Sequence, residues 1–460
     1  MSHYQMAILG GGPGGYVAAI RAAQMGAKVV LIEGGELGGV CLNEGCIPTK
    51  TLLKSARVYQ DIIGSEEYGI RLGNKGEVTI DWDAMLKRKD GVVGQLTSGV
   101  KGLLQRNGVD VVNGYGEIQD AQSILVNGQV ITAQNLILAT GSRAKILPIP
   151  GLESALKAGT AVTSTGALSL REIPQGLVIV GGGVVGIEFA ALFNALGAKV
   201  TVLEKFTILN SLDADLQRYM LRTLRKKGVE IHEQCEIEGL EGSTVLATVQ
   251  GETRAFPSDR VIVSLGRTPN VEALGRLGLA MDGEAVRTNA RLETSIPGVY
   301  AIGDLNGKHM LAHVASAEGL VAVENIMGRK AEINYDKVPA CIYSFPEVAV
   351  VGLTEQEALR RGHRLKMGTF PLAANGKALA EGEAEGFVKI VADSEYGEVL
   401  GVHIIAAQAT DLISEAVATL ELEGTVHDLA KAIHPHPTSS EIIMEAAQAT
   451  IDQAIHFFRK

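Results

Sequence analysis

The stretch that decides the fold runs from residue 6 to residue 33 and reads MAILGGGPGGYVAAIRAAQMGAKVVLIE. It opens with a short apolar run, passes through Gly10, Gly12 and Gly15 into an apolar helical pattern, and ends with a second apolar run and Glu33. The first glycine of a G-x-G-x-x-G pattern permits a tight turn. The second lets the backbone approach a pyrophosphate, and the third lets the helix pack on the strand. This order predicts a strand–helix–strand unit that binds a dinucleotide.

The same pattern recurs in LVIVGGGVVGIEFAALFNALGAKVTVLE (177–204), which ends on Glu204. Its glycines are Gly181, Gly183 and Gly186. One glycine pattern alone could be a turn in an ordinary α/β domain, but here every part of the unit coincides twice. We therefore predict two dinucleotide sites, FAD at the first and NAD at the second. Glu204 would accept from a ribose 2′-OH and repel a 2′-phosphate, which favours NAD over NADP, although the neighbouring Lys205 weakens that preference.

Composition excludes several classes of protein. The chain has 460 residues, a formal net charge of -10 and no long basic block, so we expect about three globular domains and no nucleic-acid partner. We read no signal peptide, and the apolar segment 177–204 carries Glu188 and Lys199, which argues against a membrane span. Four cysteines are too few for a disulfide-stapled secreted protein, which predicts a cytoplasmic location.

Two of those cysteines, Cys41 and Cys46, are separated by four residues in GGVCLNEGCIPTK (38–50). A structural disulfide is disfavoured in a reducing compartment, and a zinc site would need ligands that the solitary Cys235 and Cys341 do not supply. Two unrelated buried cysteines remain an alternative. A redox-active disulfide gains support because the pair precedes a helical run, and a helix N-terminus favours a thiolate.

Together with ATGS (139–142), AIGD (301–304) and HPHPTSSE (434–441), these motifs resemble the flavoprotein disulfide reductase family over nearly the whole chain. Within that family the chain is most similar to the dihydrolipoamide dehydrogenase branch. Glu204 and His434 distinguish it from the NADPH-dependent, glutathione reductase-like members.

The resemblance implies two Rossmann-like dinucleotide-binding domains and a C-terminal α+β dimerisation domain. The FAD-binding domain would span residues 1–146, with the redox disulfide, and would be completed by a central part at 271–335. The NAD-binding domain would span 147–270 and the dimer-interface domain 336–460.

The resemblance also implies catalytic roles. Cys41 would face the substrate and Cys46 the flavin. His436 would be the general base, reaching the disulfide of the other subunit, and Glu441 would orient it; His434 is the second choice for the base. From the residues alone, the two histidines also fit a polar turn before a helix.

Further residues are expected at the cofactors. Lys50 would lie beside the flavin ring and pair with Glu188, a carboxylate that needs a partner inside a largely apolar helix. The expected FAD contacts are Gly10, Gly12, Gly15, Glu33, Gly39, Lys50, Gly114, Thr140, Gly141, Ser142, Asp304, Met310, Leu311, Ala312 and His313. The expected NAD contacts are Gly181, Gly183, Gly186, Glu188, Glu204 and Gly266. No metal site is expected.

The implied activity is oxidation of protein-bound dihydrolipoamide to lipoamide, with reduction of NAD+ to NADH. The implied partners are a second copy of the chain, lipoyl domains, and the peripheral subunit-binding domain of a 2-oxo acid dehydrogenase acyltransferase. Two alternatives stay open: an NAD(P)H-dependent reductase of another low-molecular-weight disulfide, and a flavin-binding assembly subunit without turnover.

Overall fold

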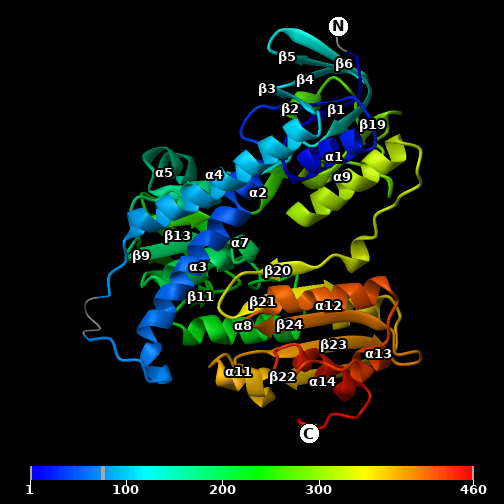
Figure 1. The fold of residues 1–460 in the computed structure, drawn as a ribbon. Helices are drawn as coiled ribbons and strands as arrows, with labels where there is room; N and C mark the ends of the chain where they lie inside the picture. Colours follow the sequence, from blue (N-terminus) through cyan, green and yellow to red (C-terminus); the bar gives the residue numbers. More distant parts are fainter. Residues whose placement is uncertain (1–2, 74–77, 458–460) are drawn as a thin grey trace. The chain divides into compact units, whose positions relative to one another are not determined.

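The computed structural model describes residues 3–73 and 78–457, which form two compact units (Figure 1). Unit 1 holds the chain up to Leu147, Val162–Glu172 and Ser264–Asn334, and unit 2 holds Pro148–Ala161, Ile173–Val263 and the chain from Tyr335 onward. In the described residues no helix is both long enough and apolar enough to cross a membrane.

Unit 1 is built on a seven-stranded sheet in the order β3-β2-β1-β6-β5-β4, with β19 also pairing with β6. Its strands are β1 (His3–Leu9), β2 (Val29–Glu33), β3 (Asp110–Asn113), β4 (Glu117–Asp120), β5 (Ser123–Val126), β6 (Gln129–Leu138) and β19 (Val299–Ala301). The pairings among β1, β2, β3, β6 and β19 are parallel, and β4, β5 and β6 form an antiparallel meander.

Both faces of this sheet are apolar and buried, and helices cover one of them. Along β1, Met6 and Ile8 belong to one buried cluster, while Ala7 and Leu9 belong to another, as the alternation of side chains along a strand requires. The helices of unit 1 are α1 (Pro13–Gln24), α2 (Gly39–Glu44), α3 (Cys46–Ile63), α4 (Trp82–Arg106), α6 (Ser164–Ala167) and α9 (Ala312–Ile326).

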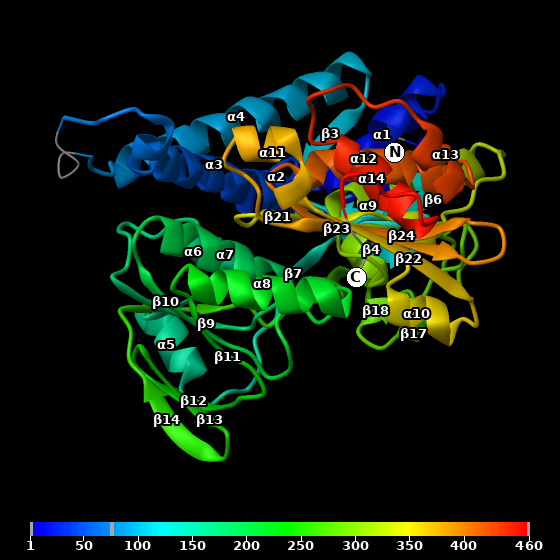
Figure 2. The same ribbon diagram turned by 90° about the horizontal axis from the view of Figure 1, so that it is seen from below.

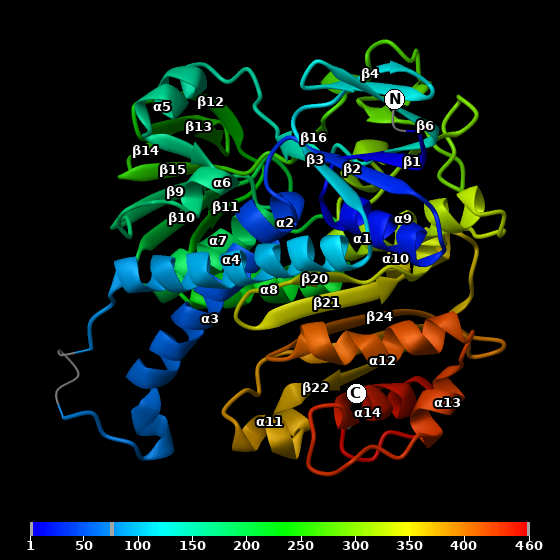
Figure 3. The same ribbon diagram turned by 45° about the horizontal axis from the view of Figure 1, so that its top comes forward.

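Helices α1 and α9 lie side by side in both views of Figures 1 and 3. Small residues permit this approach: a Cβ atom added at Gly319 would lie 2.7 Å from the carbonyl oxygen of Gly14. Unit 1 also contains a two-stranded ribbon of β7 (Ser142–Ala144) and β16 (Arg267–Pro269), and the short pair β17 (Met281–Asp282) and β18 (Ala285–Val286). Its 3₁₀ turns are η1 (Ser65–Tyr68), η3 (Glu272–Leu274) and η4 (Gly303–Asn306).

The first part of unit 2 repeats the strand–helix–strand unit. Its sheet has the order β11-β10-β9-β15-β8, and the pairings β11–β10, β10–β9 and β9–β15 are parallel. The elements are α5 (Leu152–Ala158), β8 (Ala161–Thr163), β9 (Gly176–Val180), α7 (Val184–Ala195), β10 (Lys199–Leu203), α8 (Ala214–Lys226), β11 (Glu230–His232) and β15 (Arg260–Val263). The antiparallel meander β12 (Glu236–Glu241), β13 (Thr244–Val249) and β14 (Glu252–Phe256) extends beside it (Figure 2).

The second part of unit 2 is an antiparallel sheet in the order β20-β21-β24-β23-β22. Its strands are β20 (Ala340–Ile342), β21 (Glu347–Gly352), β22 (Leu365–Pro371), β23 (Phe387–Asp393) and β24 (Val399–Ala406), preceded by the turn η5 (Tyr335–Lys337). Its helical segments are α10 (Glu355–Arg360), η6 (Leu372–Ala374), α11 (Gly376–Ala380), α12 (Ala409–Glu421), α13 (Val426–Lys431) and α14 (Glu441–Thr450). Side chains of the sheet, α12, α13 and α14 share one buried core.

These architectures confirm the predicted fold class of two Rossmann-like domains and a C-terminal α+β domain. The predicted domain bounds stay predictions. Of the residues expected in the NAD-binding domain (147–270), two segments lie in unit 1, Val162–Glu172 and Ser264–Asn270, and β16 in the second of them pairs with β7.

Candidate active site

The first glycine loop has the geometry of a phosphate cradle. Gly10 has a φ of +109°, which only glycine adopts without strain, and a Cβ atom at Gly15 would lie 1.8 Å from the Gly10 carbonyl oxygen. By contrast, a Cβ atom at Gly12 would meet nothing nearer than 3.9 Å. Gly12 caps helix α1 without a side-chain hydrogen bond. The open space and the N–H groups of the helix start fit a pyrophosphate.

Glu33 is held at the end of β2 by the same loop. Its carboxylate accepts hydrogen bonds from the N–H of Gly11 at 2.5 Å and from the N–H of Gly35 at 2.6 Å. The backbone carbonyl of Glu33 accepts from the N–H of Gly114 at 2.8 Å, where Gly114 has a φ of +153°. The acid therefore has a fixed position beside the glycines, where a ribose hydroxyl can reach it.

The second loop repeats this geometry in detail. Gly181 has a φ of +108°, a Cβ atom at Gly186 would lie 2.0 Å from the Gly181 carbonyl oxygen, and one at Gly183 would meet nothing within 4 Å. Glu204 accepts from the N–H of Gly182 at 2.6 Å and from the N–H of Phe206 at 2.8 Å. The repeat in sequence thus produces a repeated set of backbone contacts suited to a second dinucleotide.

The cysteine segment packs against the first loop. The N–H of Gly38 donates to the Gly11 carbonyl at 2.8 Å, and a Cβ atom at Gly39 would lie 2.7 Å from the Gly12 Cα atom. Cys41 follows within α2, and Cys46 is the first residue of the 18-residue helix α3. The two thiols are therefore built beside the dinucleotide cradle.

The acidity of Cys41 depends on its neighbour Cys46. The pKa of the Cys41 thiol lies well above its ordinary value because of its hydrogen bond to Cys46 and then because of burial; Lys50 acts in the opposite direction. Cys41 therefore keeps its proton while its partner is negatively charged. Cys46, at the start of α3, is the sulfur placed to carry the charge.

The remaining FAD candidates gather in unit 1 around the end of β6 and the turn after β19. The hydroxyl of Thr140 donates to the Asn270 carbonyl at 2.6 Å, and the hydroxyl of Ser142 donates to Asp304. Met310 and Leu311 immediately precede α9, and Leu311 is its N-cap; Ala312 and His313 are its first two residues. Gly141 has a φ of +70° and Gly266 a φ of +94°. Gly266 was expected at NAD but lies in unit 1.

Sequence reasoning missed Arg267, which contacts Ser142 and Asp304. One feature of the sequence could have indicated it. Arg267 follows Gly266 in VIVSLGRTPN (261–270), a segment that resembles LILATGSR (136–143), in which Ser142 follows Gly141.

Glu188 has a partner within unit 2. Its side chain is on α7 and is buried, with 4% of the residue exposed, and Oε1 accepts from the backbone N–H of Tyr343 at 3.0 Å. The expected pairing with Lys50 stays a prediction, because Lys50 belongs to unit 1.

His436 and Glu441 form a hydrogen-bonded dyad at the start of α14. Nδ1 of His436 lies 2.9 Å from Oε1 of Glu441, and Oε2 accepts from the N–H of Thr438 at 2.9 Å. Burial alone would raise the pKa of Glu441, but the hydrogen bonds from Thr438 and His436 outweigh it and lower the pKa. An ionised Glu441 holds the proton on Nδ1, so Nε2 is the nitrogen that can accept one. The His436 side chain is 77% exposed.

His434 is less suited to act as the base. Its Nε2 lies 2.8 Å from Oε1 of Glu415 and its Nδ1 lies 3.1 Å from the Ala432 carbonyl oxygen. Its side chain is only 6% exposed. Both ring nitrogens of His434 therefore already have hydrogen-bond partners within the chain. Neither is available to take a proton from a substrate thiol.

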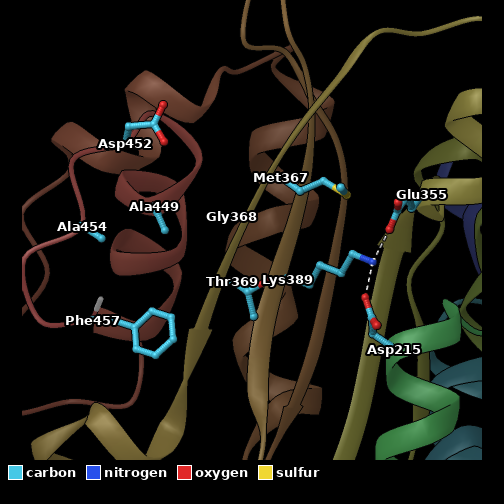
Figure 4. Close-up of a pocket in the computed structure, with 10 residues that line it drawn as sticks. All are labelled: Asp215, Glu355, Met367, Gly368, Thr369, Lys389, Ala449, Asp452, Ala454 and Phe457. Atoms are coloured by element: carbon cyan, nitrogen blue, oxygen red, sulfur yellow. Dashed lines mark hydrogen bonds and ion pairs between the residues drawn. The ribbon is translucent and has the colours of Figure 1, made fainter. Parts of the chain in front are cut away.

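A cavity of about 490 Å³ in unit 2 contains none of the predicted site residues. Lys389 lines it and lies between Asp215 and Glu355 (Figure 4). Among the described residues, no group of three or more His, Cys, Asp or Glu side chains could hold a metal ion.

Comparison with known proteins identifies two matching family models. The model described as "Pyridine nucleotide-disulphide oxidoreductase" matches residues 4–319, and its dimerisation domain matches residues 338–447. A dihydrolipoyl dehydrogenase of Thermus scotoductus is 42% identical, with 100% of each chain covered. One of Bacillus subtilis is 41% identical, covering 99% of this chain and 100% of that protein. Among solved structures, LpdA of Mycobacterium tuberculosis superposes with a TM-score of 0.88 at 27% identity, covering 97% of this chain and 99% of that one.

Proposed function

Because this chain belongs to the pyridine nucleotide-disulphide oxidoreductase family, we propose that it oxidises dihydrolipoamide to lipoamide and reduces NAD+, the activity of a dihydrolipoyl dehydrogenase. It is an FAD-dependent enzyme. The observation that carries the proposal is the hydrogen-bonded thiol pair of Cys41 and Cys46, packed on the first glycine loop. The full-length similarity to dihydrolipoyl dehydrogenases supports the choice of substrate.

The proposed thiol chemistry begins with Cys41 and Cys46 joined as a disulfide. Nε2 of His436 takes a proton from one substrate thiol, and the resulting thiolate attacks Cys41. A bond forms between the substrate sulfur and Cys41, the bond between Cys41 and Cys46 breaks, and Cys46 leaves as a thiolate. The proton on His436 passes to Cys41 as it leaves, and the second substrate thiol then gives its own proton to the freed Nε2 of His436 as its sulfur bonds to the first substrate sulfur; the bond from that sulfur to Cys41 breaks and the lipoamide ring closes. The substrate has lost two electrons, and the enzyme pair has gained them.

Other residues support these steps. The start of α3 favours a thiolate at Cys46. The positive charge of Lys50 acts on the neighbouring Cys41 thiol and lowers its pKa. The ionised Glu441 stabilises the imidazolium of His436 after it has taken the proton. FAD, bound at the first glycine loop, supplies the transfer of two electrons from the dithiol to NAD+ at the second loop.

The match to the dimerisation domain supports a homodimer. We propose that His436 of the partner subunit serves each thiol pair. We further propose lipoyl domains and the subunit-binding domain of an acyltransferase as partners, and a cytoplasmic location. The low cysteine content supports that location.

Anaerobic mixing of the yellow protein with dihydrolipoamide, followed by absorbance, tests the activity. We expect a two-electron change in the spectrum and its reversal when NAD+ is added. No change with dihydrolipoamide, but reaction of NADPH with another disulfide such as oxidised glutathione, would favour the reductase alternative. A flavin that responds to neither would favour the assembly subunit.

A further inference from the structure

A two-stranded ribbon lies where the chain leaves unit 1 and returns to it. Strand β7 (Ser142–Ala144) comes just before the exit after Leu147, and β16 (Arg267–Pro269) follows the return at Ser264. The strands are antiparallel, with Pro269 opposite Ser142 and Arg267 opposite Ala144. Two of these residues also reach Asp304, the acid expected to hold a flavin hydroxyl.

The contacts form a chain of hydrogen bonds with one possible direction. Nε of Arg267 donates to Oγ of Ser142 at 2.6 Å, and Nη2 donates to the Ser142 carbonyl at 2.7 Å. A guanidinium has donors only, so Oγ of Ser142 accepts and its own hydrogen points to Oδ2 of Asp304. Nε also lies 3.6 Å from that oxygen.

This direction defines the chemistry of Asp304. Oδ2 accepts the hydrogen bond from the Ser142 hydroxyl and lies 3.6 Å from Nε of Arg267. Oδ1 has no hydrogen-bond partner in the part of the chain that the structure describes. The two side chains are 24% and 22% exposed, and Ser142 is 3% exposed, so water screens the contacts little. Oδ1 can accept a hydrogen bond from a hydroxyl group.

We propose that Arg267 and Ser142 are positioning residues for FAD: they hold the Asp304 side chain in place and aim Oδ1 at a hydroxyl of the flavin nucleotide. The affinity for the flavin therefore depends on the ribbon of β7 and β16, the segments at which the chain leaves unit 1 and returns to it. The inference rests on the FAD site of the proposed function, but not on the substrate or on turnover.

The test measures flavin release from the purified holoenzyme after dilution, by the rise in flavin fluorescence, with circular dichroism as a check of folding. Arg267→Met should release flavin roughly 10- to 100-fold faster, because a charge-assisted network is lost. Arg267→Lys, which keeps the charge but loses the two-pronged contact, and Ser142→Ala should fall between that variant and wild type.

Arg143→Met is the matched control. Arg143 stands on the same ribbon opposite Thr268, and its guanidinium bonds Glu272 at 2.7 Å and Asn270 at 2.9 Å instead of Asp304. This variant should retain flavin like wild type. Equal release from Arg143→Met and Arg267→Met would overturn the proposal, since any damage to the ribbon would then explain the loss.

An Asp304→Asn background isolates the route of the effect. If Arg267 acts through Asp304, adding Arg267→Met to Asp304→Asn should speed release by less than about twofold. Full additivity of the two changes would refute the positioning role. If Arg267→Met fails to fold, flavin release is measured instead for Ser142→Ala in the wild-type and the Asp304→Asn proteins. The same two outcomes then support or refute the positioning role. A wild-type protein that holds FAD without oxidising dihydrolipoamide would reject the proposed function and leave this inference standing.

Discussion

At the scale of single residues, the difference between Cys41 and Cys46 predicts opposite spectra for two variants. Cys41→Ser removes the sulfur that keeps its proton, and Cys46 can then no longer form the disulfide. A Cys46 thiolate, and its long-wavelength charge-transfer band with the flavin, should therefore persist without reductant. Turnover should be lost. Cys46→Ser should lose both. Absorbance spectra and dihydrolipoamide turnover of the two proteins give the check. An absorbance band in Cys46→Ser alone would reverse the roles.

The two histidines give a second prediction at this scale. His436→Gln should keep flavin and thiols but lower dihydrolipoamide oxidation by ~10²–10⁴-fold, since a general base is removed. His434→Gln is the matched control, because both ring nitrogens of His434 are already engaged by Glu415 and Ala432. Steady-state rates of both variants decide between the residues. A larger loss in His434→Gln would make His434 the base.

At the scale of elements, the contact between the segment that follows β10 and the first residue of β12 bears on the choice of nucleotide. Glu204 follows β10 and should favour NAD+ over NADP+. The adjacent Lys205 is directed to Glu236, with Nζ at 3.3 Å from Oε1. An exposed pair of this kind is worth about 0–1 kcal/mol. Glu236→Gln should therefore raise kcat/KM for NADP+ only a few-fold and leave NAD+ nearly unchanged.

The control for this change is the double variant Lys205→Gln/Glu236→Gln. It should show no gain with NADP+, because the freed cation is gone. If kcat/KM for NADP+ rises equally in the single and the double variant, the loss of the Glu236 carboxylate causes the rise, and Lys205 does not. Wild-type protein that prefers NADP+ would contradict the role of Glu204 itself.

At the scale of the whole molecule, Lys389 ties the two parts of unit 2 together. Strand β23 of the antiparallel sheet carries it, and Nζ contacts Asp213 at 2.9 Å and Asp215 at 2.6 Å, at the start of α8, and Glu355 at 2.7 Å. Lys389→Met leaves the buried Asp213 carboxylate, whose side chain is 2% exposed, without its cation, which should cost about 3–5 kcal/mol of unfolding free energy. Lys226→Met, which breaks an exposed pair with Glu385, should cost little.

The same cluster predicts a dependence on pH. Burial would raise the pKa of Asp213, but hydrogen bonds from Lys389 and the Asp215 N–H outweigh it and lower the pKa. The stabilisation is therefore present above the ordinary value, about 4, and is lost as pH falls through the lower folded value. Thermal denaturation from pH 3 to 8 should show wild type weakening in acid. The deficit of Lys389→Met relative to wild type should shrink there; a constant deficit would exclude this linkage.

Some features of this protein follow from sequence alone because their causes are local. A tight turn at Gly10 and the close contact of Gly15 with it involve neighbours in the chain, so the glycine spacing predicted both strand–helix–strand units. The position of Cys46 before an apolar helical run likewise predicted a thiol at a helix start.

Other features depend on which strand joins which sheet, and only the tertiary structure decided them. Arg267 bonds Ser142 across 125 residues of chain, and Lys389 bonds Asp213 across 176. Gly266 lies in unit 1, next to the strand β16 that pairs with β7, and its contact with NAD stays a prediction. The backbone N–H that partners Glu188 belongs to Tyr343, 155 residues away. Spacing along the chain carries no information about such pairs, because they form only after separate elements have packed.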